Sequence, residues 1–169
     1  MGFDLYGINP VVRKGKLPNR PDGLWDKGTP EEDRDKYFDK KWEFEENNPG
    51  SYFRNNVWWW RSLWDYVYNE CEDIISEEDW DSGHSNEGHK ISEQQAVAIG
   101  KRLQELIDDG SVKQYADAHE ESRKKAEENN KDKKCGEKGY DWASSYPFDI
   151  GNVQEFATFC SESGGFEIC

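Results

Sequence analysis

The chain has 169 residues, which fits one domain of ordinary size, so we expect a single domain over 1–169. A net charge of −14 argues against nucleic acid or an anionic membrane as a direct partner. No run of 18 apolar residues is present, and the start lacks the basic and apolar regions of a signal peptide. We therefore expect a cytoplasmic protein that does not act on a membrane.

The aromatic content is high, at 14% of residues, while hydrophobic residues make up only 34%. This balance predicts a compact core built from large rings, with long polar segments outside it. The four cysteines show no paired spacing and are expected to be reduced thiols. Cys71 and Cys160 fall on apolar stripes and are expected to lie in the core.

Both ends of the chain carry short strand patterns. Near the start, Phe3 and Leu5 alternate with polar or amphipathic neighbours, and near the end Phe166 and Ile168 share one face. We expect these two strands to pair in a small sheet laid against helices.

Residues 11–50 are rich in lysine, aspartate, proline and glycine, and their prolines argue against a long helix. Because Trp42 and Phe44 alternate with glutamates, we expect one helical turn or a short strand there. We interpret 11–50 as a polar excursion whose aromatic residues pack back onto the domain; partial disorder is the alternative. These aromatic residues are Trp25, Tyr37, Phe38 and Trp42.

The central element is a tryptophan-rich helix predicted over 52–75, because apolar residues recur there at spacings of four and three. They are Phe53, Val57, Trp60, Trp64, Val67, Cys71 and Ile74. An acidic loop follows, and then Ser92 and Gln95 form a capping box that opens a helix ending at Gly110.

A further helix is predicted from about Val112, with Tyr115 and His119 on its inner side. Its stripe fades after Glu120, so 120–139 is interpreted as a second polar excursion. Asp149 is the expected N-cap of the last helix. The predicted fold is α+β, with about four helices around the Trp-rich helix and a small sheet from the N- and C-terminal strands.

Four stretches together resemble a family of small proteins encoded by bacteriophages and bacteria, for which no activity is established. They are MGFDLYGINP, YFRNNVWWWRSLWDYV, GHSNEGHKI and YPFDIGNVQEFATFCSESGGFEIC. The resemblance implies a phage or prophage setting, and hence the cytoplasm of a bacterial host. Relatives with extra cysteine pairs before the YPF motif resemble carriers of a small zinc insert. Only Cys135 stands there in this chain, so no metal is expected.

One constellation is typical of a binding site for a flat anion. Arginine, amide and indole groups at a helix start offer charge pairing, hydrogen bonds and stacking to a nucleotide-like ligand. With the nearby polar loop, the candidate ligand-binding residues are Arg54, Asn55, Asn56, Trp58, Arg61, His84, Asn86 and His89. The structural alternative is that Arg61 pairs with Asp65 while the asparagines cap the helix.

The GHSNEGH loop, residues 83–89, is a weaker candidate for catalysis. Its histidines match no standard zinc spacing, and the chain has no GxSxG, CxxC, P-loop or dinucleotide motif. No cofactor and no catalytic residue is therefore assigned.

The favoured function is a phage counter-defence protein that sequesters a small nucleotide-like ligand. The alternative is an acidic, protein-binding inhibitor of a host defence or nucleic-acid-handling protein. A small hydrolase or transferase that uses the GHSNEGH loop ranks third.

Overall fold

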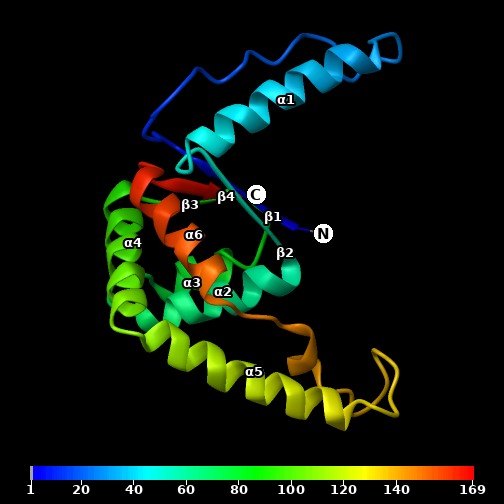
Figure 1. The fold of residues 1–169 in the computed structure, drawn as a ribbon, viewed down its shortest axis with the longest axis vertical. Helices are drawn as coiled ribbons and strands as arrows, with labels where there is room; N and C mark the ends of the chain where they lie inside the picture. The colour runs from blue at the N-terminus through cyan, green and yellow to red at the C-terminus, as the bar shows by residue number, and fades with distance from the viewer. Residues whose placement is uncertain (1) are drawn as a thin grey trace.

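The N- and C-terminal strands lie side by side in one antiparallel sheet, as predicted (Figure 1). This computed structural model describes residues 2–169. The fold is α+β, as expected, with six α-helices and four strands in the described part of the chain. The elements are β1 Gly2–Gly7, α1 Glu31–Asn47, β2 Tyr52–Asn56, α2 Val57–Glu70, α3 Glu77–Ser82, β3 His89–Ile91, α4 Glu93–Asp108, α5 Ser111–Asn129, the 3₁₀ helix η1 Trp142–Ser145, α6 Ile150–Glu162 and β4 Phe166–Ile168.

The sheet has the strand order β2-β1-β4-β3. Leu5 in β1 is the common partner of Phe53 in β2 and Ile168 in β4, and all three side chains are buried. The polar side chains that alternate with them face the other side of the sheet, as the period of two requires. The Gly7 N–H donates to the Ser51 carbonyl (3.1 Å), which closes the connection between β1 and β2.

The Trp-rich helix is shorter than predicted. Residues 52–56 form β2, and α2 begins at Val57, because Phe53 pairs with Leu5 across the sheet and buries its ring there. In α2, Trp60 and Trp64 are fully buried and stacked, with ring centroids 5.2 Å apart. This part of the predicted apolar face is confirmed.

The core lies between the sheet and helices α2, α4 and α6. Helices α2 and α6 both contact β2, and α4 packs closely along α6. At Gly100 in α4 a Cβ atom would meet the Ala157 carbonyl oxygen at 2.8 Å, so glycine permits this approach. The capping box of Ser92 and Gln95 and the N-cap Asp149 are confirmed, and Cys71 and Cys160 are buried.

Two arms project from this core on the same side, giving the C-shaped outline in Figure 1. One arm is α1, a helix of 17 residues where at most one helical turn or a short strand was expected. The expectation was wrong because the prolines flank this helix; Pro30 stands at its N-cap and Pro49 follows its end. The buried Asn48 fastens the preceding segment to α1. Its Oδ1 accepts the Lys14 N–H (3.1 Å), and its Nδ2 donates to the Lys14 carbonyl (2.8 Å).

The other arm is the distal part of α5 with the segment that returns through η1. The helix continues to Asn129, nine residues beyond Glu120, where its apolar pattern ends. Arg123 pairs with Glu120 and Glu127 on the helix surface, and such pairs support a helix without burial. Asn130 then holds the returning segment by bonds to the Asp141 N–H and carbonyl, both 2.8 Å. None of the helices among residues 2–169 combines the length and apolar character that crossing a bilayer needs.

Candidate functional site

A cavity of about 540 Å³ opens where α2, α3, α5 and η1 meet. Its volume falls within the range of about 300–1,000 Å³ that small-molecule sites occupy. Charged, imidazole and aromatic side chains from separate parts of the chain line it. Helix α2 contributes Arg61, Ser62 and Asp65, and α3 with the loop after it contributes Trp80 and His84. The other lining residues are Tyr115 and His119 of α5, Ala143 of η1, and Tyr146.

Helix α2 supplies the cation of the site. The side of α2 opposite its buried stripe carries Arg61 and Asp65, which are one turn apart. Arg61 is exposed, and no acceptor among residues 2–169 takes a hydrogen bond from its guanidinium. The cavity therefore contains a positive charge that is free to meet a ligand.

Asp65 is held by two partners, one from α3 and one from the loop that follows it. Its Oδ1 accepts the Trp80 Nε1–H at 2.9 Å and lies 3.1 Å from His84 Nε2. Burial alone would raise the pKa of Asp65, but these two hydrogen bonds, with the nearby Arg61, hold that pKa below its usual value. Asp65 is therefore ionised at neutral pH and fixes the edges of both rings.

His84 has no ring nitrogen available for proton transfer in this arrangement. Its Nε2 faces Asp65, and its Nδ1 is covered and has no partner in the described part of the chain. The segment from Trp80 to His84 is also held by the core. Trp60 Nε1 donates to the Gly83 carbonyl at 2.8 Å, and Trp64 Nε1 donates to the Trp80 carbonyl at 3.0 Å. The core tryptophans thus set the position of this cavity wall.

The α5 wall consists of Tyr115 and His119. Tyr115 packs against the tilted ring of Tyr66 (ring centroids 4.6 Å) and edge-to-face against Phe148 (4.8 Å), which fixes its ring. Burial raises the pKa of Tyr115, so its hydroxyl stays protonated and can donate. Burial lowers the pKa of His119, so this imidazole is neutral at pH 7.

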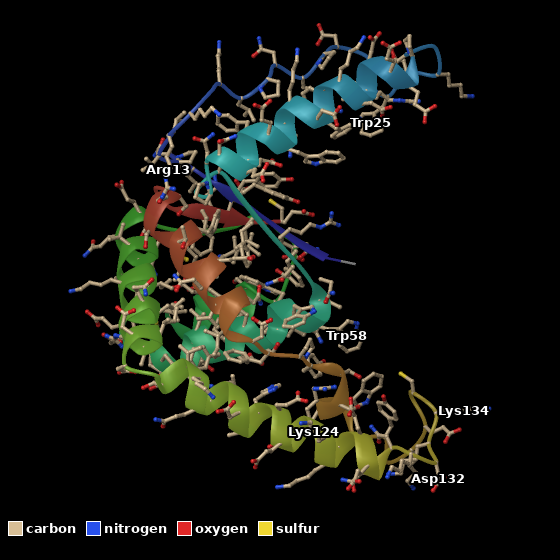
Figure 2. The ribbon with its side chains drawn as sticks, in the orientation of Figure 1. Arg13, Trp25, Trp58, Lys124, Asp132 and Lys134 are labelled. Carbon is tan, nitrogen blue, oxygen red and sulfur yellow. The ribbon has the colours of Figure 1, made fainter. Side chains whose placement is uncertain are left out.

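The remaining wall is the segment around η1. The Ser62 hydroxyl donates to the Pro147 carbonyl and thereby joins α2 to this segment. Trp58 is not among the lining residues; it stacks on Trp142 with ring centroids 6.2 Å apart and lies edge-on to Tyr146 at 5.3 Å. Figure 2 labels Trp58 at the start of α2. The aromatic side chains thus continue from the cavity onto the surface.

Of the predicted ligand-binding residues, Arg61 and His84 line this cavity and Trp58 adjoins it. Arg54 and Asn55 do not, because they belong to β2 and not to the helix. Arg54 Nε lies 3.4 Å from Asp4 Oδ1, and Asn55 Nδ2 donates to Asn152 Oδ1 at 3.0 Å. The expectation that Arg54 and Asn55 stand at the start of the helix is therefore wrong. Asn56 caps α2, with its Oδ1 accepting from two backbone N–H groups.

The remaining predicted residues fasten the GHSNEGH loop. Asn86 Nδ2 donates to the Gly2 carbonyl at 2.9 Å, while His89 Nε2 lies 2.8 Å from Asp79 Oδ1. The two histidines of the loop thus bind different carboxylates. Among residues 2–169, no three His, Cys, Asp or Glu side chains gather as a metal ion would require. Burial raises the pKa of the Cys71 thiol to about 12, which leaves it unreactive.

Sequence reasoning missed seven of the nine lining residues, among them the aromatic and imidazole groups of Trp80, Tyr115, His119 and Tyr146. Tyr115 and His119 were placed on the inner side of one helix, and their spacing of four was the available signal. The pattern did not reveal that this side meets α2 across a cavity. A larger hollow of about 780 Å³ lies between α1 and segment 14–24, but exposed lysines and carboxylates of mixed sign line it.

Comparison of the chain with protein-family models, with curated proteins and with solved structures finds no match, so the site geometry carries the functional argument.

Proposed function

We propose that the protein binds a small, flat, anionic ligand of the nucleotide type in the cavity between α2, α3, α5 and η1. The observation that supports this most directly is the unpaired Arg61 guanidinium beside the rings of Trp80 and Tyr146. A guanidinium suits a phosphate or carboxylate, and aromatic faces suit a base or another planar group.

The hydroxyl groups of the cavity extend the match. Tyr115 and Tyr146 have no hydrogen-bond partner for their phenol oxygens among residues 2–169, and both line the cavity. Both tyrosines are half-buried, so a ligand in the cavity can accept hydrogen bonds from their hydroxyl groups. The site therefore favours a ligand that carries acceptor oxygens on one side and a ring on the other.

Binding agrees with the geometry better than hydrolysis or group transfer by the histidines of the GHSNEGH loop. A general base needs an accessible nitrogen close to the proton it takes, and His84 offers none. The resemblance to phage proteins supports a setting in the cytoplasm of a bacterial host. There, sequestration of a signalling nucleotide would interfere with a host defence.

The test is isothermal titration and thermal unfolding against a panel of mono-, di- and cyclic nucleotides. A ligand present at 100 times its Kd stabilises the folded protein by about 2.7 kcal/mol. We expect at least one member to do so, and Arg61→Ala to abolish the effect. The matched control is Arg54→Ala, which removes an exposed arginine of β2 outside the cavity and leaves binding intact.

Two results would reject the proposal. One is the absence of binding by every member of the panel. The other is equal affinity in Arg61→Ala and in the unaltered protein.

A further inference from the structure

Two exposed tryptophans lie on one side of the α1 arm: Trp42 on the helix itself and Trp25 in the segment that precedes it. The exposed fractions of Trp25 and Trp42 are 63% and 61%, although indole is among the largest apolar groups a protein can bury. Phe38 lies between them, with ring centroids 5.8 Å from Trp25 and 6.0 Å from Trp42. The expectation that these aromatic residues pack back onto the domain is wrong for both tryptophans. They form a continuous exposed patch, of the kind that marks interaction surfaces.

The opposite side of α1 is already covered. Leu24 and Phe44 are buried between α1 and the segment that precedes it, and Asn48 fixes that segment in place. Figure 2 shows Trp25 beside α1 on the side away from the covering segment, toward the open side of the C-shaped outline. The covering segment thus packs on one side of α1, and the two exposed tryptophans lie on the other side.

Carboxylates surround this patch. Asp35, Asp39 and Glu46 stand seven and three residues before Trp42 and four after it, so they share its side of the helix. All three are exposed, and none forms an ion pair among residues 2–169. Lys41, the neighbour of Trp42 in sequence, is engaged by Glu45 and lies over the Tyr52 ring.

We propose that this acidic aromatic face, formed by Trp25, Phe38 and Trp42 with Asp35, Asp39 and Glu46, docks a basic segment of a partner protein. Lysine and arginine side chains combine apolar stems with cationic heads, so they can lie on indole faces while pairing with the flanking carboxylates. A purely apolar partner would desolvate the carboxylates without compensation. A second copy of the chain would bring another net charge of −14 toward this face.

This face shares no residue with the cavity lining, so binding of a basic peptide can be tested separately from nucleotide binding. The probes are fluorescein-labelled peptides of equal length, one rich in arginine and lysine, one rich in glutamate and one neutral. Fluorescence anisotropy reports binding, and a salt titration reports its electrostatic part. We expect the basic peptide alone to bind, with an affinity that falls as salt rises.

Three variants test whether the peptide binds to this face or is attracted only by the overall negative charge of the protein. The double variant Trp25→Ala, Trp42→Ala is expected to weaken binding about tenfold or more, and so is Asp35→Asn, Asp39→Asn. The matched control Glu121→Gln, Glu155→Gln removes the same charge from exposed positions on α5 and α6 and should bind as the unaltered protein does. Circular dichroism checks that each variant folds. Should the tryptophan variant unfold, the asparagine pair decides.

Several outcomes overturn the proposal: equal binding of all three peptides, an unchanged affinity in the asparagine pair, or an equal loss in the control. Sedimentation at matched concentrations supplies another readout. A dimer that disappears in Asp35→Asn, Asp39→Asn would assign the face to a second copy instead of a basic partner.

Discussion

Arg61 and Asp65 lie one turn apart on α2 with opposite charges, yet they form no ion pair. Asp65 instead accepts hydrogen bonds from Trp80 and His84 through a single oxygen. The structural alternative considered for Arg61, a pair with Asp65, is therefore wrong. The carboxylate organises the wall of the cavity, and the guanidinium remains available to a ligand.

Removal of this carboxylate should loosen that wall. In Asp65→Ala the Trp80 and His84 ring nitrogens lose their shared acceptor, and we expect a loss of about 1 kcal/mol in unfolding free energy, modest because the site is half exposed. Urea denaturation measures the change. Asp81→Ala, an exposed position on α3, is the control and should change stability by less than about 0.5 kcal/mol. Equal effects in the two variants would contradict the organising role of Asp65.

His119 should make stability depend on pH in the mildly acidic range. Burial lowers its pKa, so the unfolded chain binds a proton at a higher pH than the folded protein does. The free energy of unfolding should therefore fall as pH drops from about 6.5 through the lower folded value. In His119→Gln this part of the fall should disappear. Parallel stability curves for the two proteins would show that His119 contributes nothing.

Asn48 should control the attachment of segment 13–24 to α1. Its amide bonds the Lys14 main chain on both sides, and it also donates to the Phe44 carbonyl at 2.7 Å. In Asn48→Ala we expect trypsin to cleave at Lys14 and Lys16 several-fold faster, because local opening exposes the backbone. Mass spectrometry locates the cuts. The body should stay intact, and unchanged cleavage rates would refute the role of Asn48.

Gly100 tests the closeness of α4 and α6. In Gly100→Ala the new methyl group meets the Ala157 carbonyl, and we expect a loss of about 1–3 kcal/mol from overpacking. Gly28→Ala is a matched control, because a Cβ there meets nothing within 4 Å. Thermal unfolding of both variants gives the comparison. Equal melting temperatures would mean that the two helices can move apart at little cost.

The sequence predicted the elements whose burial follows a single period. The stripe of Trp60, Trp64 and Val67 and the alternation of Phe3 and Leu5 are local patterns, so α2 and β1 were found. The start of α2 was misplaced because Phe53 fits a helical spacing and a strand spacing equally well. Its pairing with Leu5 of β1 decides in favour of the strand, and this pairing depends on tertiary structure that a local pattern does not contain.

Helix α1 was missed for another reason. It buries only Phe44, so it carries no apolar stripe for periodicity to detect. The site was predicted in part: the charge of Arg61 and the position of His84 pointed to it, but Trp80 and Tyr146 join them only through the packing of α3 and η1. Strand β3, with three residues, is too short to leave a period.

The hydrogen bond from Gly7 to Ser51 means that the chain leaves the sheet and re-enters it at one point. Loop-closure entropy grows only with the logarithm of length, by about 0.6 kcal/mol for each doubling. The long connection that contains α1 therefore adds little to the entropy cost of bringing β1 and β2 together. A shorter connection between β1 and β2 would keep the strand pair and the cavity while removing the exposed tryptophans, so the two proposed binding surfaces can change independently.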